Sequence, residues 1–187
     1  MGAFFHSYDE AWEAFLAREE PLEDFLADWP EDAGYVASAW VIEPPPAVKE
    51  AVLRLQSSFA HLDWIVPVPE HFLHVALGPS PWELGLTFPV EIEYRRVGAF
   101  HAVVIVEAHC PPLRELVEDE SFLPHLTIGV TRSPGPAAPL REALAPLRDT
   151  VLGRQRVEEV KLCQFPAART TLLQPWAVEE VVRLTAG

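Results

Sequence analysis

Residues 121–130, SFLPHLTIGV, constrain the fold of this chain more than any other segment. Side chains of a β-strand point alternately to its two faces, so as a strand this segment places His125, Thr127 and Gly129 on one face. Aliphatic side chains occupy the other face, which therefore requires a hydrophobic core. The opposite face presents an imidazole beside a hydroxyl, followed by a glycine that allows a close approach to the backbone.

Residues 72–78, FLHVALG, repeat this arrangement. His74, Ala76 and Gly78 share one face of the second predicted strand, and the aliphatic residues between them share the other. The interval between His74 and His125 leaves room for two or three strands and a helix. We therefore expect two similar halves, each built around one histidine-bearing strand.

Two strands with a His-x-Thr/Ser pattern, one in each half, resemble the 2H phosphoesterase superfamily. This group includes the 2′-5′ RNA ligase-like proteins and related cyclic nucleotide phosphodiesterases. The motifs stand here as HVAL at residues 74–77 and HLTI at residues 125–128, and Pro124 fits the family's pattern before the second histidine. The resemblance covers residues 34–187 as a bilobal domain and leaves residues 1–33 as an acidic helical N-terminal appendage.

The resemblance implies an α+β fold with two pseudo-symmetric lobes around a central cleft that carries the two histidine motifs. Each lobe is expected to be an antiparallel sheet with an outer helix. Apolar periodicity agrees, because strand-helix-strand-strand order occurs twice. Besides the histidine strands, we expect helices at residues 48–59, 111–117 and 140–147 and strands at residues 35–42, 63–70 (an edge strand), 88–97, 102–108, 157–165 and 177–185.

The N-terminal appendage is expected to form one or two acidic helices within residues 7–29. Ser7 and Glu10 have the spacing of a capping box, and Pro21 interrupts the apolar stripe that follows. This segment can simply pack on the domain, or it can serve as a lid or a partner-binding helix pair. Gly153 is placed to cap the helix at residues 140–147.

Histidine titrates near neutral pH, so two histidines can supply the base that activates water and the acid that protonates a departing ribose oxygen. The resemblance implies this role for His74 and His125, and the sequence leaves open which is the acid. Thr127 points to the same side as His125 and is expected to anchor the phosphate. No metal ion and no cofactor is expected.

Ala76 departs from the family's pattern, which has Thr or Ser at this place in the first motif. The loss of a single donor to developing charge costs on the order of 10²–10³ in rate. Either another hydroxyl such as that of Ser80 substitutes, or the domain binds a nucleotide that it no longer turns over. Arg132 is expected on the His125 face if the strand runs straight, as a contact to a substrate phosphate or as a solvated strand-end arginine.

The formal charge of −14 argues against a surface for long nucleic acids, which is normally basic. The expected partner is a small phosphorylated nucleotide or an RNA terminus, and the oligomeric state is left open. No apolar run approaches the length of a membrane span, and the N-terminus has no signal-peptide pattern. Cys110 and Cys163 fit no metal or redox spacing and are expected to be buried thiols in a cytoplasmic protein.

The resemblance implies a metal-independent phosphoesterase that opens 2′,3′-cyclic phosphates of small nucleotides or RNA ends, and it leaves 2′-5′ RNA ligase-like activity open. The alternative is a catalytically impaired module of the same fold that binds nucleotides or RNA ends. A third class is an interaction protein that acts through the N-terminal helices. Trp40, Phe72 and Phe122 are candidates for stacking on a base, although aromatic side chains more often belong to a core.

Overall fold

The computed structural model describes residues 5–27, 29–31, 36–78, 81–117, 122–166, 168–171 and 173–185. Ser80 and the predicted boundary between residues 33 and 34 lie outside these ranges. The strands are β1 (Val36–Ile42), β2 (Ile65–Pro67), β3 (Val75–Ala76), β4 (Val90–Phe100), β5 (Val103–His109), β6 (His125–Thr131), β7 (Val151–Val157), β8 (Glu159–Pro166) and β9 (Ala177–Arg183). The helices are α1 (Tyr8–Ala17), α2 (Pro46–Gln56), α3 (Pro111–Leu116) and α4 (Ala137–Leu144), with short 3₁₀ turns at Glu70–Phe72 and Ala145–Leu147.

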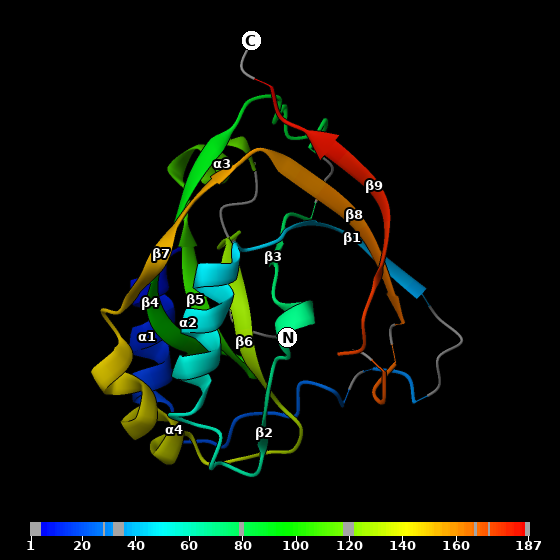
Figure 1. Ribbon diagram of the computed structural model, residues 1–187. Coiled ribbons are helices and arrows are strands. Elements are labelled where there is room, and N and C mark those ends of the chain that lie inside the picture. Colours follow the sequence, from blue (N-terminus) through cyan, green and yellow to red (C-terminus); the bar gives the residue numbers. More distant parts are fainter. Residues whose placement is uncertain are drawn as a thin grey trace.

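These strands form one antiparallel sheet in the order β7-β4-β5-β6-β3-β1-β8-β9, and β2 pairs with β6 beside that path. Figure 1 shows the sheet curling from β7 at one edge to β9 at the other. The α+β class is confirmed. Two halves of this sheet, β7-β4-β5-β6 and β3-β1-β8-β9, meet where β3 pairs with β6. The division into two pseudo-symmetric lobes stays a prediction. The histidine-bearing strands are therefore neighbours at the centre of the molecule.

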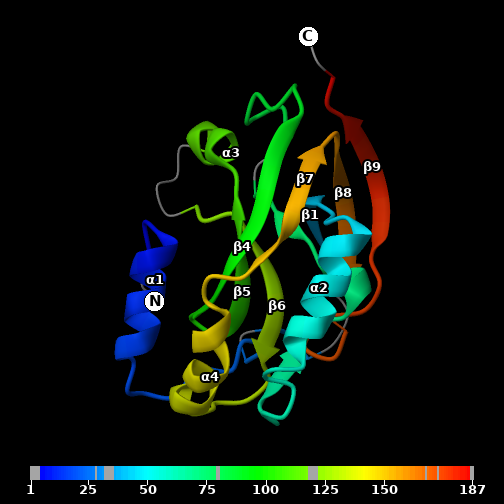
Figure 2. The same cartoon turned by 60° about the vertical axis from the view of Figure 1, so that its left-hand side comes forward.

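Helices α1 and α2 lie on opposite sides of the sheet (Figure 2). Although α2 follows β1 in the chain, it packs against β6 and β7 of the other half. The buried amide of Gln56 ties its end to the sheet, because Nε2 donates to the carbonyl oxygens of Val68 and Ile128 at 2.7 and 2.9 Å. Because both hydrogen bonds satisfy the buried amide, its burial stabilises the contact between α2 and the sheet and leaves no donor unpaired.

Helix α1 begins at the predicted cap, where the Ser7 hydroxyl accepts a hydrogen bond from the backbone N–H of Glu10 at 3.1 Å. The Glu10 carboxylate reaches back to the N–H of His6 and not to that of the cap residue. The apolar face of α1, including Trp12 and Phe15, is buried in the same core as the sheet. That face is therefore occupied by the domain itself, as in the simpler of the two interpretations of this segment.

Of the one or two helices expected within residues 7–29, α1 is the one that forms in the described part of this range. Leu22 instead pairs with Gly135 in an isolated antiparallel bridge, and the chain continues in turns. A second helix does not form there because Leu22 and Phe25 donate their backbone N–H groups to Gly135 and Thr131, and the local bonds further along close only turns.

Strand β6 does not run straight. Its pairing with β5 shifts between Val104, which pairs with Gly129, and Ile105, which pairs with Thr127, so Ile128 is bulged out of the ladder. A bulge reverses the faces of the residues beyond it. Gly129 therefore faces the ring of Phe59, which a Cβ there would approach to 3.0 Å, and the prediction that it shares the His125 face was wrong.

One further prediction changes at β7, a strand that the sequence pattern did not indicate. Gly153 lies within this strand opposite Tyr94, with φ of +151°, and does not cap α4. Glycine tolerates this conformation because it has no Cβ. The strands expected at residues 88–97 and 102–108 form the hairpin of β4 and β5, which turns at His101. Strand β9 lies within the strand expected at residues 177–185 and pairs with β8.

Candidate active site

The two histidine motifs face each other across the β3–β6 pairing. Val75 pairs directly with Leu126 in antiparallel register, and both side chains are fully buried. The neighbours of this pair therefore share the opposite, more accessible face, where His74 comes beside Thr127 and Ala76 comes beside His125. Each histidine thus lies next to the third position of the other motif.

Both imidazoles are held in the same way. Nδ1 of His74 lies 2.7 Å from the carbonyl oxygen of Phe72, and Nδ1 of His125 lies 2.6 Å from that of Leu123. A carbonyl oxygen only accepts, so Nδ1 carries the proton and donates it in both rings. Nε2 of each neutral ring is then the nitrogen with a lone pair, and it can accept a proton during a reaction.

Burial lowers the pKa of both histidines because it disfavours the charged imidazolium. For His74 this desolvation outweighs the bond to the Phe72 carbonyl, and the pKa falls to about 4, with the positive charge of a protonated His125 lowering it further. Burial also lowers the pKa of His125, aided by His101. Both rings are accordingly neutral at pH 7 in the free protein.

Aromatic rings flank each histidine. The centroid of the Trp176 ring lies 4.7 Å from that of the His74 ring. The ring of Phe72 lies edge-on to the His74 ring, with a centroid distance of 5.2 Å. Phe100 lies edge-on to His125 at 5.0 Å. Packing of this kind excludes water from the imidazoles, which is consistent with the direction of both pKa shifts.

A pocket of about 150 Å³ opens beside this pair. It brings His74 and Thr127 together with side chains from the N-terminal segment, β6, β8 and the region before β9. The lining consists of Phe25, Trp29, Val68, Phe72, His74, Thr127, Val130, Phe165 and Leu173. Val130 reaches this pocket because the bulge at Ile128 turns it toward the His74 side.

No family model and no curated protein matches this chain significantly, but solved structures do. TT0787 of Thermus thermophilus is 20% identical with a TM-score of 0.57, covering 79% of this chain and 97% of that one. Escherichia coli LigT complexed with ATP is 19% identical with a TM-score of 0.52, covering 80% and 98%. LigT complexed with 3′-AMP is 17% identical with a TM-score of 0.56, covering 81% and 99%. The chain has the LigT fold.

A structure described as a phosphoesterase is 17% identical with a TM-score of 0.56, covering 80% of this chain and 98% of that one. The resemblance that the two histidine motifs indicated is therefore confirmed at the level of the fold. The LigT fold explains why two motifs distant in sequence lie on neighbouring strands. Within the described residues, no helix is long and apolar enough to cross a membrane.

Arg132, expected to contact a substrate phosphate, follows the bulge in β6, so the straight-strand argument for its face does not apply. Its side chain is exposed, and Nε donates to the carbonyl oxygen of Asp63 at 2.7 Å. Its backbone N–H donates to Trp64. A role in phosphate binding stays a prediction for this residue.

Phe72, among the three aromatic candidates, lies in the pocket. Trp40 instead packs edge-on against Trp82 at 5.2 Å, and Phe122 packs on the core. Trp176 and Trp29 were missed, because their contacts with the site depend on the tertiary path of both ends of the chain. No pattern near either residue in the sequence indicates a site.

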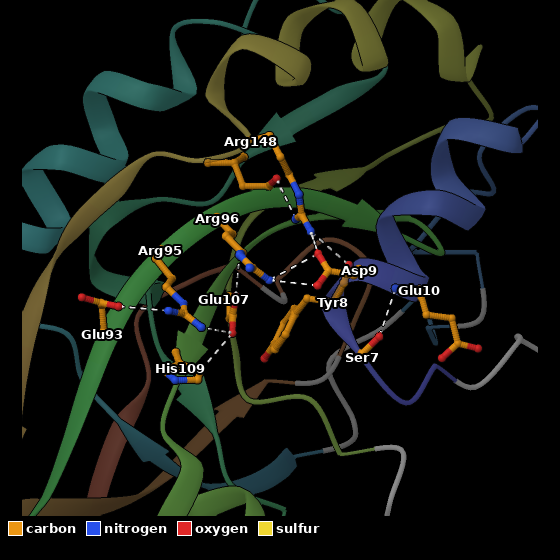
Figure 3. A network of polar contacts seen from close by, with 11 residues as sticks. Ser7, Tyr8, Asp9, Glu10, Glu93, Arg95, Arg96, Glu107, His109 and Arg148 are labelled. Atoms are coloured by element: carbon orange, nitrogen blue, oxygen red, sulfur yellow. Dashed lines mark hydrogen bonds and ion pairs between the residues drawn. The ribbon is translucent and has the colours of Figure 1, made fainter.

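Glu107 of β5, also missed, pairs in register with His125 and is almost completely buried. Its carboxylate lies 3.4 Å from the Arg95 guanidinium and 3.1 Å from Nδ1 of His109 (Figure 3). Arg96 approaches it at 3.8 Å. These contacts compensate for the burial of a carboxylate next to the histidine strand.

The same polar network fastens α1 beside His125. Arg96 and Arg148 bind the carboxylate of Asp9 at 3.2 and 2.9 Å (Figure 3). The Tyr8 hydroxyl donates to the carbonyl oxygen of Pro124, which directly precedes the histidine. The N-terminal helix therefore contacts the backbone that positions one of the two candidate catalytic groups.

The face that α1 covers is the one that carries the histidines. Gly98 pairs with Ile105, which pairs with Thr127, and directly opposite residues share a face. A Cβ on Gly98 would point at the indole of Trp12, 3.7 Å away. Helix α1 therefore occupies the β4 side of this face and leaves the β6–β3 side to the candidate site.

Among the described residues, no three His, Cys, Asp or Glu side chains gather in a way that could hold a metal ion.

Proposed function

We propose that this protein is a metal-independent 2H phosphoesterase that opens 2′,3′-cyclic phosphates of small nucleotides or RNA ends. The observation that carries the proposal is the matched pair of imidazoles, of His74 directly before β3 and of His125 at the start of β6. Both donate Nδ1–H to the carbonyl two residues earlier, so both present Nε2 for proton transfer. A base and an acid of the same kind, on one accessible face, are what the reaction requires.

In the proposed reaction, Nε2 of one histidine accepts a proton from water as the water oxygen attacks phosphorus. The bond from phosphorus to the ribose 3′ oxygen breaks, and the imidazolium of the other histidine gives its proton to that oxygen. The product is a 2′-phosphomonoester, and one turnover leaves the pair with one proton, as at the start. The arrangement treats the two rings alike, so either assignment of acid and base satisfies this balance.

The acid must be protonated although burial favours neutral rings. The negative charge of a bound phosphodiester supplies the compensation, because a nearby opposite charge favours the imidazolium. We propose the hydroxyl of Thr127 as the donor to a non-bridging phosphate oxygen, since it lies beside His74 in the same pocket. Structures of LigT complexed with ATP, 3′-AMP and NADP⁺ support nucleotide binding by this fold.

The second candidate is a binding module of the same fold with impaired catalysis. Ala76 favours it, because this exposed side chain beside His125 cannot donate a hydrogen bond. Weakened stabilisation of the transition state with intact ligand contacts would leave affinity but little turnover. The two candidates differ in turnover and not in the ligand that they bind.

Ring opening of the four nucleoside 2′,3′-cyclic monophosphates, followed by product identification in EDTA, tests the proposal. We expect turnover in the wild type and a decrease of about 10²–10⁴-fold in His74→Ala and His125→Ala. His61→Ala, which removes an exposed histidine in the turn that follows α2, is the matched control and should retain activity. Turnover that EDTA abolishes, or that survives both substitutions, would overturn the mechanism. Binding of cyclic nucleotides without turnover by the wild type would favour the binding module.

A further inference from the structure

The pocket beside His74 and Thr127 is built for a flat apolar group. Apart from these two residues, its described lining is apolar, and it contains no lysine or arginine. Aromatic rings contribute from two directions, Phe25 and Trp29 from the N-terminal segment and Phe72 from the turn before β3. A phosphate would lack charged donors at this depth, whereas a planar ring finds aromatic side chains to stack on.

The size of the pocket fits the same class of group. Its volume is about 150 Å³. An engineered protein cavity of about 150 Å³ lined by Leu, Ile and Phe is large enough to bind benzene. One heteroaromatic ring can therefore enter this pocket, and its attached sugar would remain at the open side, next to His74 and Thr127.

The wall that carries Phe25 and Trp29 is a strap formed by residues 22–27 and 29–31. On one side, the strap is fastened to the half of the sheet that contains β6. Leu22 exchanges backbone hydrogen bonds with Gly135 at 2.8 and 3.2 Å. The N–H of Phe25 donates to both the carbonyl and the hydroxyl oxygen of Thr131 at 3.1 and 3.0 Å.

The other side of the strap is fastened to the segment that follows β8. The backbone N–H of Arg169 donates to the carbonyl oxygen of Pro30 at 2.8 Å, and its guanidinium lies 2.6 Å from the Asp24 carboxylate. The strap thus bridges the two halves of the sheet beside the candidate site. Its aromatic side chains are held in place by contacts at both ends and do not depend on a ligand for their position.

We propose that this pocket takes the nucleobase of the substrate and that the strap, through Trp29 and Phe25, determines the preference for a base. The proposal rests on the proposed function for the position of the phosphate, which the histidines and Thr127 receive while the base lies between the strap and Phe72. The protein is then specific for nucleotides and not for ribose phosphates in general. The selecting residues belong to the N-terminal segment and not to the histidine motifs.

Calorimetric titration with 3′-CMP, whose base is a single heteroaromatic ring, and with methyl riboside 3-phosphate, which lacks the base, tests this inference without any turnover. We expect the wild type to bind 3′-CMP about 5- to 150-fold more tightly, the range that stacking on one base supports. Trp29→Ala should remove most of that difference and leave the affinity for the base-free ligand within about twofold of the wild-type value. Trp29→Phe should preserve most of it, because a ring remains.

Trp82→Ala is the matched control, since Trp82 is 56% exposed and packs on Trp40 away from the pocket. It should leave both affinities unchanged. Equal affinity of the wild type for the two ligands, absence of binding to either, or an equal loss of both in Trp29→Ala would overturn the proposal. The comparison of the two ligands on the wild-type protein tests the proposal even if Trp29→Ala fails to fold. If the wild type opens no cyclic phosphate but shows the expected difference in affinity, the proposed reaction fails and the nucleobase pocket stands.

Discussion

Val75 pairs directly with Leu126, and this one antiparallel pair places each histidine beside the third residue of the other motif. A phosphate bound between the strands would meet His74 and Thr127 on one side and His125 and Ala76 on the other. The hydroxyl missing from the first motif is therefore missing beside the second histidine. That relationship makes the consequence of Ala76 testable by adding one hydroxyl.

Replacement of Ala76 by threonine is expected to raise kcat for ring opening by up to about 10²–10³-fold, because it restores a donor aimed at developing phosphate charge. The side chain at this position is exposed, so the added atoms meet no core. Ala76→Val is the control, since valine has the shape of threonine without the hydroxyl. An equal gain in both variants, or none in the threonine variant, would show that no donor is lacking there.

Replacement of Thr127 by valine should lower kcat by about 10²–10³-fold with a smaller effect on KM, because a donor that acts mainly in the transition state is lost. The two side chains are nearly equal in volume, so the pocket keeps its shape. Thr127→Ser keeps the hydroxyl and should retain most of the activity. If Thr127→Ser lowers kcat as much as Thr127→Val does, activity depends on the methyl group and not on the hydroxyl. That result would rule out the proposed contact with phosphate.

The pH dependence of kcat/KM should report the lowered pKa values of the histidine pair in the free enzyme. The active form carries one proton on the pair. Because the pKa of His74 falls to about 4 and that of His125 lies below its usual 6.5, this form is most populated at acidic pH. Above about pH 6.5, kcat/KM should fall about tenfold per unit as the acid loses its proton.

The corresponding optimum of kcat should lie at higher pH, because the bound phosphodiester raises the pKa of the imidazolium. Steady-state rates in EDTA between about pH 4 and pH 8 measure both profiles, and the exposed-histidine variant His61→Ala should leave them unchanged. A kcat/KM that rises through about pH 7 is incompatible with a buried acid–base pair of this kind.

Alternation in the sequence was sufficient to predict β6, whereas at the first motif only Val75–Ala76 is a strand, with His74 directly before it and Phe72 in a 3₁₀ turn. A strand with one face in the core needs an apolar side chain at every second position, and Val75, Leu77 and Leu126 are fully buried as expected. The alternation also placed His74 and Thr127 on accessible faces. What it could not supply is the pairing partner of each strand, so the contact of Glu107 with the histidine strand was not predictable.

The strap was not predictable for a different reason. Residues 22–29 have apolar side chains at helical spacing, and that spacing predicts a helix when local bonds are satisfied within the segment. Here the N–H of Phe25 is bonded to Thr131, more than a hundred residues away, and Trp29 lines a pocket. Tertiary hydrogen bonds replaced the helical ones, and only the folded arrangement reveals them.

The bulge at Ile128 was equally invisible, and it leads to a prediction about stability. A Cβ on Gly129 would lie 3.0 Å from Cε2 of Phe59 and 3.3 Å from Cγ2 of Ile65, both in the core. Gly129→Ala should therefore lower the free energy of unfolding by about 1–3 kcal/mol, the cost of overpacking, as measured by urea denaturation. Gly98→Ala, whose Cβ would approach its neighbours only to 3.4 Å, is the matched control. The double variant Phe59→Leu, Gly129→Ala should recover part of the stability that Gly129→Ala loses. If the losses of the two single variants simply add in the double variant, the side chain at position 129 does not contact Phe59.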